Sequence, residues 1–460
     1  MVFLVGSWNF AKPRVVTIAT LTVVAIFIAV ASVRLSAITL AVLFLMVLVT
    51  AFSFVDDAKS VNIILVWIAT QNAIVPFLFF RSQESPTFWT EVLAASQVTV
   101  ILVVITHFFF DTWAGRRRSP TFISSAILYS IVLVLIAVLH RGTNLFSSFN
   151  SAREAMVPAL YLSLGFMISK SESSRVGLLR TIAGLTVVGA VFALVDAIFL
   201  GTRFWSNIDL GQYWIQVKHT PAYEVVNGLP GNLYENYDGV ILSRAISFYG
   251  DPLAAGYSMA LGYAALLFLY ERSKRFKNLY LASIFVVLAG ISVTYTRAAY
   301  IIVAIETLSF AIYWRSANKR IPRLLLLSVP LIIILLADKV LTANGSVLLH
   351  LQAMSFLPYL LSHPLGTGAG TLGGPEGAYL QIWYQYGILP LILFMIFMYN
   401  VYVFVKRSPT PYSYVGAGIL VALVVSGFIS EEMLTDTACS IGWVLLGMIA
   451  SMHLRPAAEH

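Results

Sequence analysis

A glycine-rich stretch followed by an aromatic segment carries the residues best suited to chemistry. It runs from His363 to Gly387, reads HPLGTGAGTLGGPEGAYLQIWYQYG, and holds six glycines up to Gly377. Glycines permit tight turns, and successive N–H groups in such turns form concavities that bind anions. We expect a helix from about Pro375, because proline suits the first helical turn and the Glu376 carboxylate suits the positive end of the helix. The stretch would bring phosphate-binding amides and a carboxylate together.

Glu376 has two interpretations from sequence alone. It can act as a general base that takes a proton from a sugar hydroxyl, or it can bind the free N–H groups at the helix terminus. The helix terminus and nearby arginines would lower the pKa of this carboxyl group, which keeps it ionised but weakens it as a base. Its position and charge would then matter more than its basicity.

Three aromatic residues follow on the same expected helix. Tyr379, Trp383 and Tyr386 are spaced i, i+4 and i+7, so they share one face. Such a face can stack on a carbohydrate, but aromatic residues also form belts at membrane interfaces. Both interpretations remain open.

The composition of the chain is that of a polytopic membrane protein. Of its 460 residues, 59% are hydrophobic and only 11% are charged. The single cysteine, Cys439, excludes an intrachain disulfide and a cysteine-based zinc site. The sequence pI is about 9.4, but the basic residues cluster in short loops between apolar runs, where they act as orientation signals. We therefore expect no nucleic-acid partner, and no recognisable motif indicates a metal or cofactor.

The apolar runs predict an all-α bundle of about 14 transmembrane helices that forms one membrane domain over residues 1–460. The expected spans are 15–33, 36–55, 61–80, 93–112, 121–140, 155–169, 177–199, 253–270, 279–296, 298–314, 324–340, 378–405, 412–430 and 437–453. Lys12 and Arg14 precede the first span, which we expect to be a retained anchor.

Most of the 29 lysines and arginines fall in loops that thread to one side, so the positive-inside rule places both termini in the cytoplasm. The opposite, periplasmic side then carries two larger loops, 200–252 and 338–377. We expect an amphipathic helix over Ser346–Leu361 in the second of them. Glu431, Glu432 and Asp436 form an acidic turn on the same side, which we interpret as a solvated loop.

Cations on the outer side are retained against this orientation bias. Arg244 ends the first large loop, and Arg297 lies in the tight turn TYTRAAY between two spans. Two guanidinium groups converging from different turns would clamp a diphosphate, whereas an isolated arginine often extends to the lipid headgroups. Arg203, Lys218 and His219 either extend this basic surface or are ordinary loop residues.

Four motifs in this order resemble the O-antigen ligase/polymerase superfamily, the bacterial membrane glycosyltransferases of the Wzy and WaaL type. They are Arg244 followed by Gly250-Asp251-Pro252, the turn from Thr294 to Ala299, HPLGTGAG from His363 to Gly370, and Glu376-Gly377 with Gly387 further along the helix. The resemblance covers roughly residues 180–430. Ligases of this family carry a histidine with a small polar partner where this chain has Glu376-Gly377, so the resemblance favours a polymerase.

The resemblance implies a GT-C-like helical bundle in the bacterial inner membrane with a periplasmic active site. It implies inverting, metal-independent transfer of a glycan from undecaprenyl diphosphate to a hydroxyl of another lipid-linked repeat unit, as in O-antigen or related surface polysaccharide synthesis. Arg244 and Arg297 would hold the diphosphate, and Glu376 would occupy the position of the base. The implied partners are the lipid-linked oligosaccharide donor and acceptor, membrane lipids and a chain-length regulator protein. The expected substrate-binding residues are Arg203, Lys218, His219, His363, Gly368, Gly370, Tyr379 and Trp383.

Two alternatives differ in product or in class. The first is a ligase that transfers the glycan to lipid A core or to a protein hydroxyl. The second is a transporter or flippase, for which the intramembrane Glu306 and His107 are the supporting features. Transporters commonly show repeat symmetry, and no such symmetry is evident in the sequence.

Overall fold

We describe the fold from a computed structural model, which defines residues 57–81, 85–113, 120–169, 171–218, 225–237, 240–317, 355–371 and 374–454. Several predictions lie outside these ranges: the spans 15–33, 36–55 and 324–340, most of the amphipathic helix expected over Ser346–Leu361, and His219.

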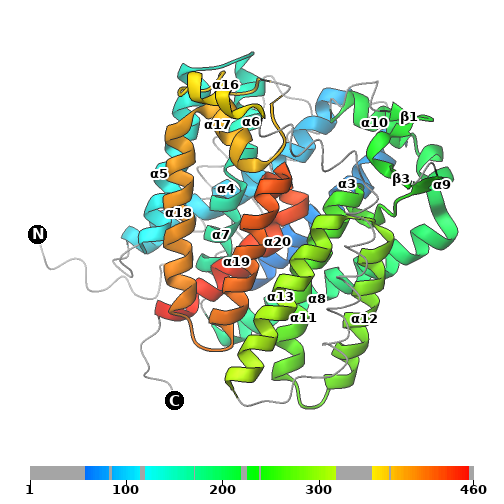
Figure 1. The fold of residues 1–460 in the computed structure, drawn as a ribbon, viewed down its shortest axis with the longest axis vertical. Helices are drawn as coiled ribbons and strands as arrows, with labels where there is room; N and C mark the ends of the chain where they lie inside the picture. The colour runs from blue at the N-terminus through cyan, green and yellow to red at the C-terminus, as the bar shows by residue number, and fades with distance from the viewer. Residues whose placement is uncertain are drawn as a thin grey trace, which may run out of the picture.

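Helices dominate the described residues, which confirms an all-α protein (Figure 1). Within the part of the chain that the structure describes, seven helices are long and apolar enough to cross a membrane. They are α3 (Asp57–Arg81), α5 (Thr121–Leu139), α8 (Glu172–Val195), α11 (Pro252–Arg272), α13 (Arg297–Ser316), α18 (Ile388–Lys406) and α19 (Tyr412–Ile429). Further apolar helices contain shorter apolar stretches: α4 (Pro86–Trp113), α7 (Val157–Ile168), α12 (Lys277–Val293) and α20 (Asp436–Ser451). The expected total of 14 spans is not confirmed.

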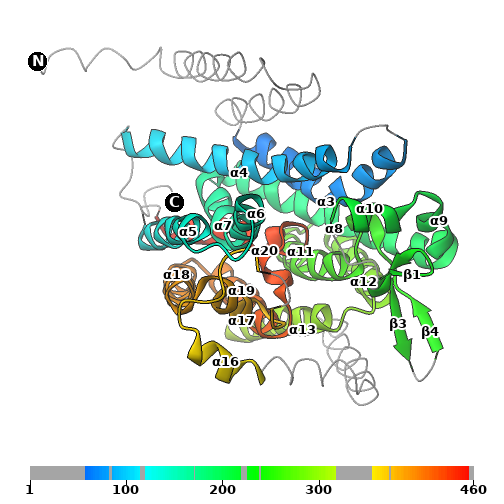
Figure 2. The ribbon, with the colours of Figure 1, turned by 90° about the horizontal axis from the view of Figure 1, so that it is seen from above.

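The centre of the bundle is formed by α11 and α20, whose residues are almost all buried (Figure 2). Glycines permit the close approach of α20 to α7. A Cβ on Gly447 would lie 2.0 Å from the carbonyl oxygen of Leu162, and one on Gly165 would lie 2.1 Å from that of Val444. Small residues of this kind let membrane helices pack backbone to backbone.

One end of the bundle carries most of the additional structure, and we call it the loop end; it is uppermost in Figure 1. Its elements are α6 (Leu145–Ala155), α9 (Gly201–Asn207), α10 (Leu210–Gln216), α16 (Leu357–Ser362), α17 (Ala378–Tyr386), the 3-10 helices η3 (Gly231–Leu233), η4 (Ser247–Tyr249) and η5 (Glu431–Leu434), and four strands. The strands pair as two antiparallel hairpins, β1 (Val225–Val226) with β2 (Leu229–Pro230), and β3 (Tyr234–Tyr237) with β4 (Val240–Ser243).

The first large loop is therefore a folded unit. Trp205, Tyr213, Leu229 and Leu233 are buried in a second apolar core, which also contains Val75 of α3 and Trp89 of α4. This core explains why the loop is rich in aromatic residues, because its short helices and hairpins are held by packing against α3 and α4.

The predicted span 378–405 is wrong as a single helix, because Gly387 separates α17 from α18. Gly387 has φ 86°, a conformation that favours glycine, and a Cβ there would lie 2.7 Å from the carbonyl oxygen of Pro364. The N–H of Ile388 donates to that same oxygen at 2.9 Å. The glycine-rich stretch thus packs into the break between the two helices.

Candidate functional site

Arg244 and Arg297 lie together at the loop end, as the sequence predicts. Arg244 directly follows β4, and Arg297 is the first residue of α13, after a turn in which Tyr295 has φ 51°. The pKa of Arg244 is lowered by burial and, to a lesser extent, by repulsion from Arg297, while Asp251 and Glu235 act in the opposite direction. The two guanidinium groups therefore share one electrostatic environment.

Arg244 is only 9% exposed, and protein atoms occupy most of its hydrogen-bonding capacity. Its Nε donates to the carbonyl oxygen of Thr294 at 2.9 Å, Nη1 donates to that of Asn232 at 3.1 Å, and Nη2 donates to Thr296 Oγ1 at 3.1 Å. A guanidinium has five N–H donors, so at least three are committed. Arg244 fastens the first large loop to the turn before α13.

Arg297 is the more accessible of the two cations, with 23% of its side chain exposed. Its Nη2 lies 2.6 Å from Oε1 of Glu235 in β3. A phosphate that displaced this carboxylate would supply an equivalent negative charge to the guanidinium. Arg297 is thus the better placed of the pair to contact a phosphate.

The glycine-rich stretch is tied to the connection between α5 and α6. The N–H of Ala369 donates to His140 O at 3.0 Å, and the N–H of Gly142 donates to Ala369 O at 2.9 Å. The N–H of Thr367 donates to Tyr384 O in α17 at 2.7 Å. These amides bind protein oxygens in place of the anion that we expected.

Gly368 and Gly370 are required by packing. They have φ 105° and 80°, and a Cβ on Gly368 would lie 2.5 Å from the backbone nitrogen of Gly142. His363 is exposed, its ring stacks on Tyr359 with centroids 4.2 Å apart, and its Nδ1 lies 2.9 Å from Tyr359 O. Contacts within the protein therefore explain the residue type at Gly368 and Gly370 and the position of the His363 ring, without a ligand.

Glu376 is exposed and precedes α17, which begins at Ala378. The helix expected from Pro375 starts three residues later, because Gly377 has φ 98° and cannot be helical. Glu376 lies close enough to Glu431 to raise the pKa of that carboxyl group. It therefore borders the site and does not cap the helix from within its first turn.

The aromatic face expected on α17 is mostly part of the core. Tyr379 is 6% exposed, donates its hydroxyl to Val424 O at 3.0 Å, and contacts the ring of Phe428 at a centroid distance of 4.6 Å. Its ring is therefore enclosed by protein and offers no open face to a sugar. Trp383 is half-buried, and its Nε1 has no hydrogen-bond partner among the described residues.

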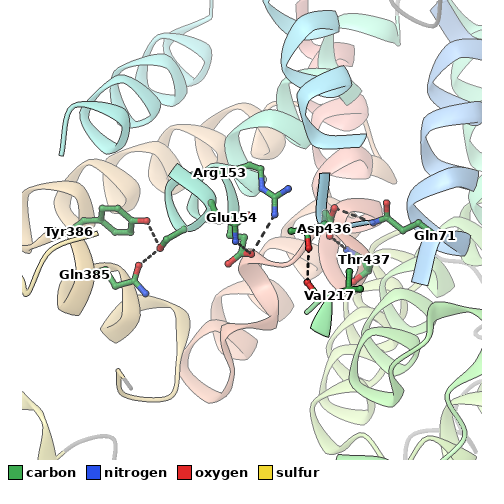
Figure 3. Close-up of polar contacts among 11 residues, drawn as sticks. Gln71, Arg153, Glu154, Val217, Gln385, Tyr386, Asp436 and Thr437 are labelled. Carbon is green, nitrogen blue, oxygen red and sulfur yellow. Dashed lines mark hydrogen bonds and ion pairs between the residues drawn. The ribbon is translucent and has the colours of Figure 1, made fainter. Parts of the chain in front are cut away.

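A recess lined by acids and amides, which the sequence analysis missed, lies between α6, α17 and η5. We call it the acidic recess; its volume is about 150 Å³. Figure 3 shows Glu154 from α6 near Gln385 and Tyr386 from α17. The lining residues are Ser151, Glu154, Ala155, Gln381, Ile382, Gln385, Tyr386, Glu431, Leu434 and Thr435.

Hydrogen bonds across the recess join α6 to α17. Tyr386 donates its hydroxyl to Ser151 Oγ at 2.6 Å, and Ser151 donates in turn to Gln385 Oε1 (Figure 3). Gln381 Oε1 is buried and has no donor among the described residues. These hydrogen bonds fix the wall of the recess that α6 and α17 form.

Two carboxyl groups of the recess have raised pKa values. The pKa of Glu154 is raised by burial more than Arg153, 3.6 Å away, lowers it. The pKa of Glu431 is raised by burial and then by repulsion from Glu154 and Glu376. Half of the Glu154 side chain is reached by water, which weakens the effect of burial on its pKa.

Asp251 and Glu432 connect the acidic recess to the arginine pair. Asp251 accepts from Asn232 Nδ2 at 3.0 Å, and the carbonyl oxygen of Asn232 accepts from Arg244. The pKa of Glu432 is raised well above its ordinary range by burial and by Asp251, and Lys218 lowers it slightly. The acidic turn that we interpreted as a solvated loop is therefore a partly buried 3-10 helix between the two halves of the site.

The remaining predicted cations take other positions. Lys218 lies 4.9 Å from the ring centroid of Trp214 and is attracted to Glu154 and Glu432, so it faces acids. Arg203 is exposed on α9. Within the described ranges, no group of three or more His, Cys, Asp and Glu side chains is arranged to hold a metal ion.

The residues of the recess left only weak signals in the sequence. Gln381 and Gln385 are four positions apart and so share a face of α17, and Glu431 belongs to the acidic turn. Nothing in the sequence indicated that Glu154 would meet them. No family model matches this chain, and no curated protein matches it. The site itself consists of a cationic half, Arg244 and Arg297, and an adjoining acidic half, the acidic recess.

Proposed function

We propose that this protein is a membrane glycosyltransferase that moves a glycan from a polyprenyl diphosphate, such as undecaprenyl diphosphate, to a hydroxyl of another lipid-linked glycan. The reaction would take place at the loop end, on the periplasmic side of a bacterial inner membrane, as in an O-antigen polymerase. The observation that carries this proposal is the convergence of Arg244 and Arg297 beside the apolar helices α11 and α13. Such an arrangement suits a ligand with an anionic head and an apolar tail.

The arginine pair suits the leaving group of this reaction. Charge builds on the diphosphate as its bond to the sugar breaks, and cations fixed beforehand stabilise that charge without reorganisation. Arg297 contacts the phosphate after exchanging Glu235, while the committed donors of Arg244 hold the surrounding loop in place. A single displacement of this kind inverts the anomeric carbon.

The two alternatives receive different support. A ligase would use the same arginine pair and differ only in its acceptor, so product analysis decides between them. A transporter is favoured by one observation: both carboxylate oxygens of the buried Glu306 lack a hydrogen-bond partner among the described residues. However, α13 with Glu306 and α4 with His107 lie on opposite sides of α11 and α20 (Figure 2). Arg244 and Arg297 lie at the loop end, whereas transporters commonly place their binding groups near mid-membrane.

The decisive experiment supplies purified protein in detergent with a lipid-linked repeat unit and no other acceptor, and then resolves the glycans by size. A polymerase produces a ladder. Arg297→Ala should abolish the ladder while the protein remains monodisperse. Arg315→Ala is the matched control, because Arg315 is exposed at the other end of α13; it should leave the ladder unchanged.

Other outcomes would change the assignment. Transfer that appears only when lipid A core or a protein acceptor is added would identify a ligase. A normal ladder from Arg297→Ala would remove the arginine pair from the mechanism. Absence of transfer to any of these acceptors would contradict the glycosyltransferase proposal.

A further inference from the structure

We propose that the acidic recess is the acceptor site of this enzyme, where one sugar ring binds between α6, α17 and η5 and Glu431 takes the proton of the attacking hydroxyl. This inference rests on the proposed glycosyl transfer. It assigns the base to a residue that the motifs did not indicate, and it assigns the acceptor to a site apart from the arginine pair.

The size of the recess matches a single ring. Its volume is about 150 Å³, and a protein cavity of about that size accommodates one benzene molecule. Glu154 and Glu431, which line it, are both exposed, so the recess opens to solvent. One pyranose ring can therefore enter while the rest of its glycan extends outward.

The walls suit a neutral or amino sugar. Sugar hydroxyls are donors that need acceptors, and the carboxylates of Glu154 and Glu431 supply them. Leu434 and Ile382 provide apolar surface for the C–H groups of the ring. Two carboxylates repel a diphosphate, so the anionic part of each substrate is directed towards Arg297.

Proton removal is better suited to Glu431 than to Glu376. A general base works best when its pKa lies near the working pH, and the pKa of Glu431 is raised by burial, by Glu154 and by Glu376. Both glutamates are exposed, but only Glu431 lines the recess. Glu376 acts on Glu431 through repulsion between the two carboxylates, which raises the pKa of Glu431.

The acceptor hydroxyl oxygen forms a bond to the anomeric carbon of the donor, and its proton passes to Glu431. The bond between that carbon and the diphosphate oxygen breaks, and the electron pair leaves with the polyprenyl diphosphate. No oxidant, reductant or further reactant is required.

The charges around Glu431 come from several elements. Those that act on it or on its carboxylate neighbours are Arg153 and Glu154 of α6, Lys218 after α10, Asp251 before α11, Glu376 before α17, Glu432 of η5 and Asp436 of α20. The acids outnumber the cations, so removing one acid should lower the pKa of Glu431.

The test uses the full-length enzyme, the lipid-linked repeat unit as substrate, and undecaprenyl diphosphate alone as a binding probe. Glu431→Gln should lower the transfer rate by about 10²-fold to 10⁴-fold, the range for loss of a general base. Its affinity for undecaprenyl diphosphate should remain that of the wild type, whereas Arg297→Ala should weaken that binding.

A pH profile separates a base from a merely structural residue. Glu154→Gln removes one source of repulsion, so the acidic limb of its rate profile should move to lower pH relative to the wild type. Glu172→Gln is the matched control, since Glu172 is exposed at the start of α8 and pairs with Arg272 away from the recess. Its profile should coincide with that of the wild type.

Each outcome decides a different point. A wild-type ladder together with full activity of Glu431→Gln, or an unmoved profile for Glu154→Gln, overturns the assignment of the recess and leaves glycosyl transfer intact. Loss of activity in Glu376→Gln as severe as in Glu431→Gln, with the profile of the remaining activity unshifted, returns the base to Glu376. A wild type without any transfer contradicts the proposed function and this inference with it.

Discussion

The arginine pair and the acidic recess adjoin each other, yet their side chains are used in opposite ways. Arg244 commits three donors to Asn232, Thr294 and Thr296, and Arg297 already has an anion beside it in Glu235. The recess is lined by amide side chains and by two carboxyl groups whose pKa values are raised. One half is built to hold fixed charge, and the other retains capacity for a ligand that donates hydrogen bonds.

The largest loss of stability and activity should come from a substitution in the arginine pair. Arg244→Ala leaves the carbonyl oxygens of Thr294 and Asn232 without their charged donor, and hydrogen bonds to charged groups contribute about 1.5–3 kcal/mol each. We expect a loss of about 3 kcal/mol or more, seen as a lower midpoint of thermal unfolding, together with loss of transfer. Unchanged stability would show that the first large loop is held by other contacts.

An intermediate effect is expected from the recess. Gln381→Ala removes an acceptor that has no donor among the described residues, so the protein should keep its thermal stability. If the recess binds the acceptor, KM for the lipid-linked acceptor should rise about tenfold, the equivalent of one hydrogen bond. A fall in stability without a change in KM would assign Gln381 to packing.

The smallest effect concerns Glu432, which lies between the two halves. Because its pKa is raised, the folded protein binds more protons than the unfolded chain, so its contribution to stability is present at low pH and is lost as pH rises through the pKa of the folded state. Glu432→Gln should therefore raise the thermal midpoint by about 1–2 °C at pH 8 and leave it unchanged at pH 4. Equal effects at both values would exclude titration of Glu432 as the cause.

The sequence was informative where a local pattern, or the order of consecutive helices, determines which residues lie at the same end of the bundle. Arg244 and Arg297 lie in two connections that flank α11 and α12, which pack together, so their turns had to meet at one end of the bundle. Apolar runs revealed the long helices for the same reason, since each is a local pattern. The break at Gly387 was visible as a glycine, but its consequence depends on contact with Pro364.

The acidic recess could not be predicted from local patterns in the sequence. Its walls come from residues 151–155, 381–386 and 431–435, and no local pattern indicates that α6 lies against α17. Tyr379 illustrates the same limit, because helical spacing showed which residues share its face but could not show that Phe428 covers its ring. Contacts between elements distant in the chain determined both outcomes.

The position of η5 has a consequence for synthesis of the protein. Glu431 belongs to the connection between α19 and α20, and α20 occupies the centre of the bundle. A nascent chain that has emerged only as far as α19 lacks both this central helix and one wall of the recess. The complete recess therefore forms only after the final described helix has been inserted, so unfinished chains lack the acceptor site that we propose.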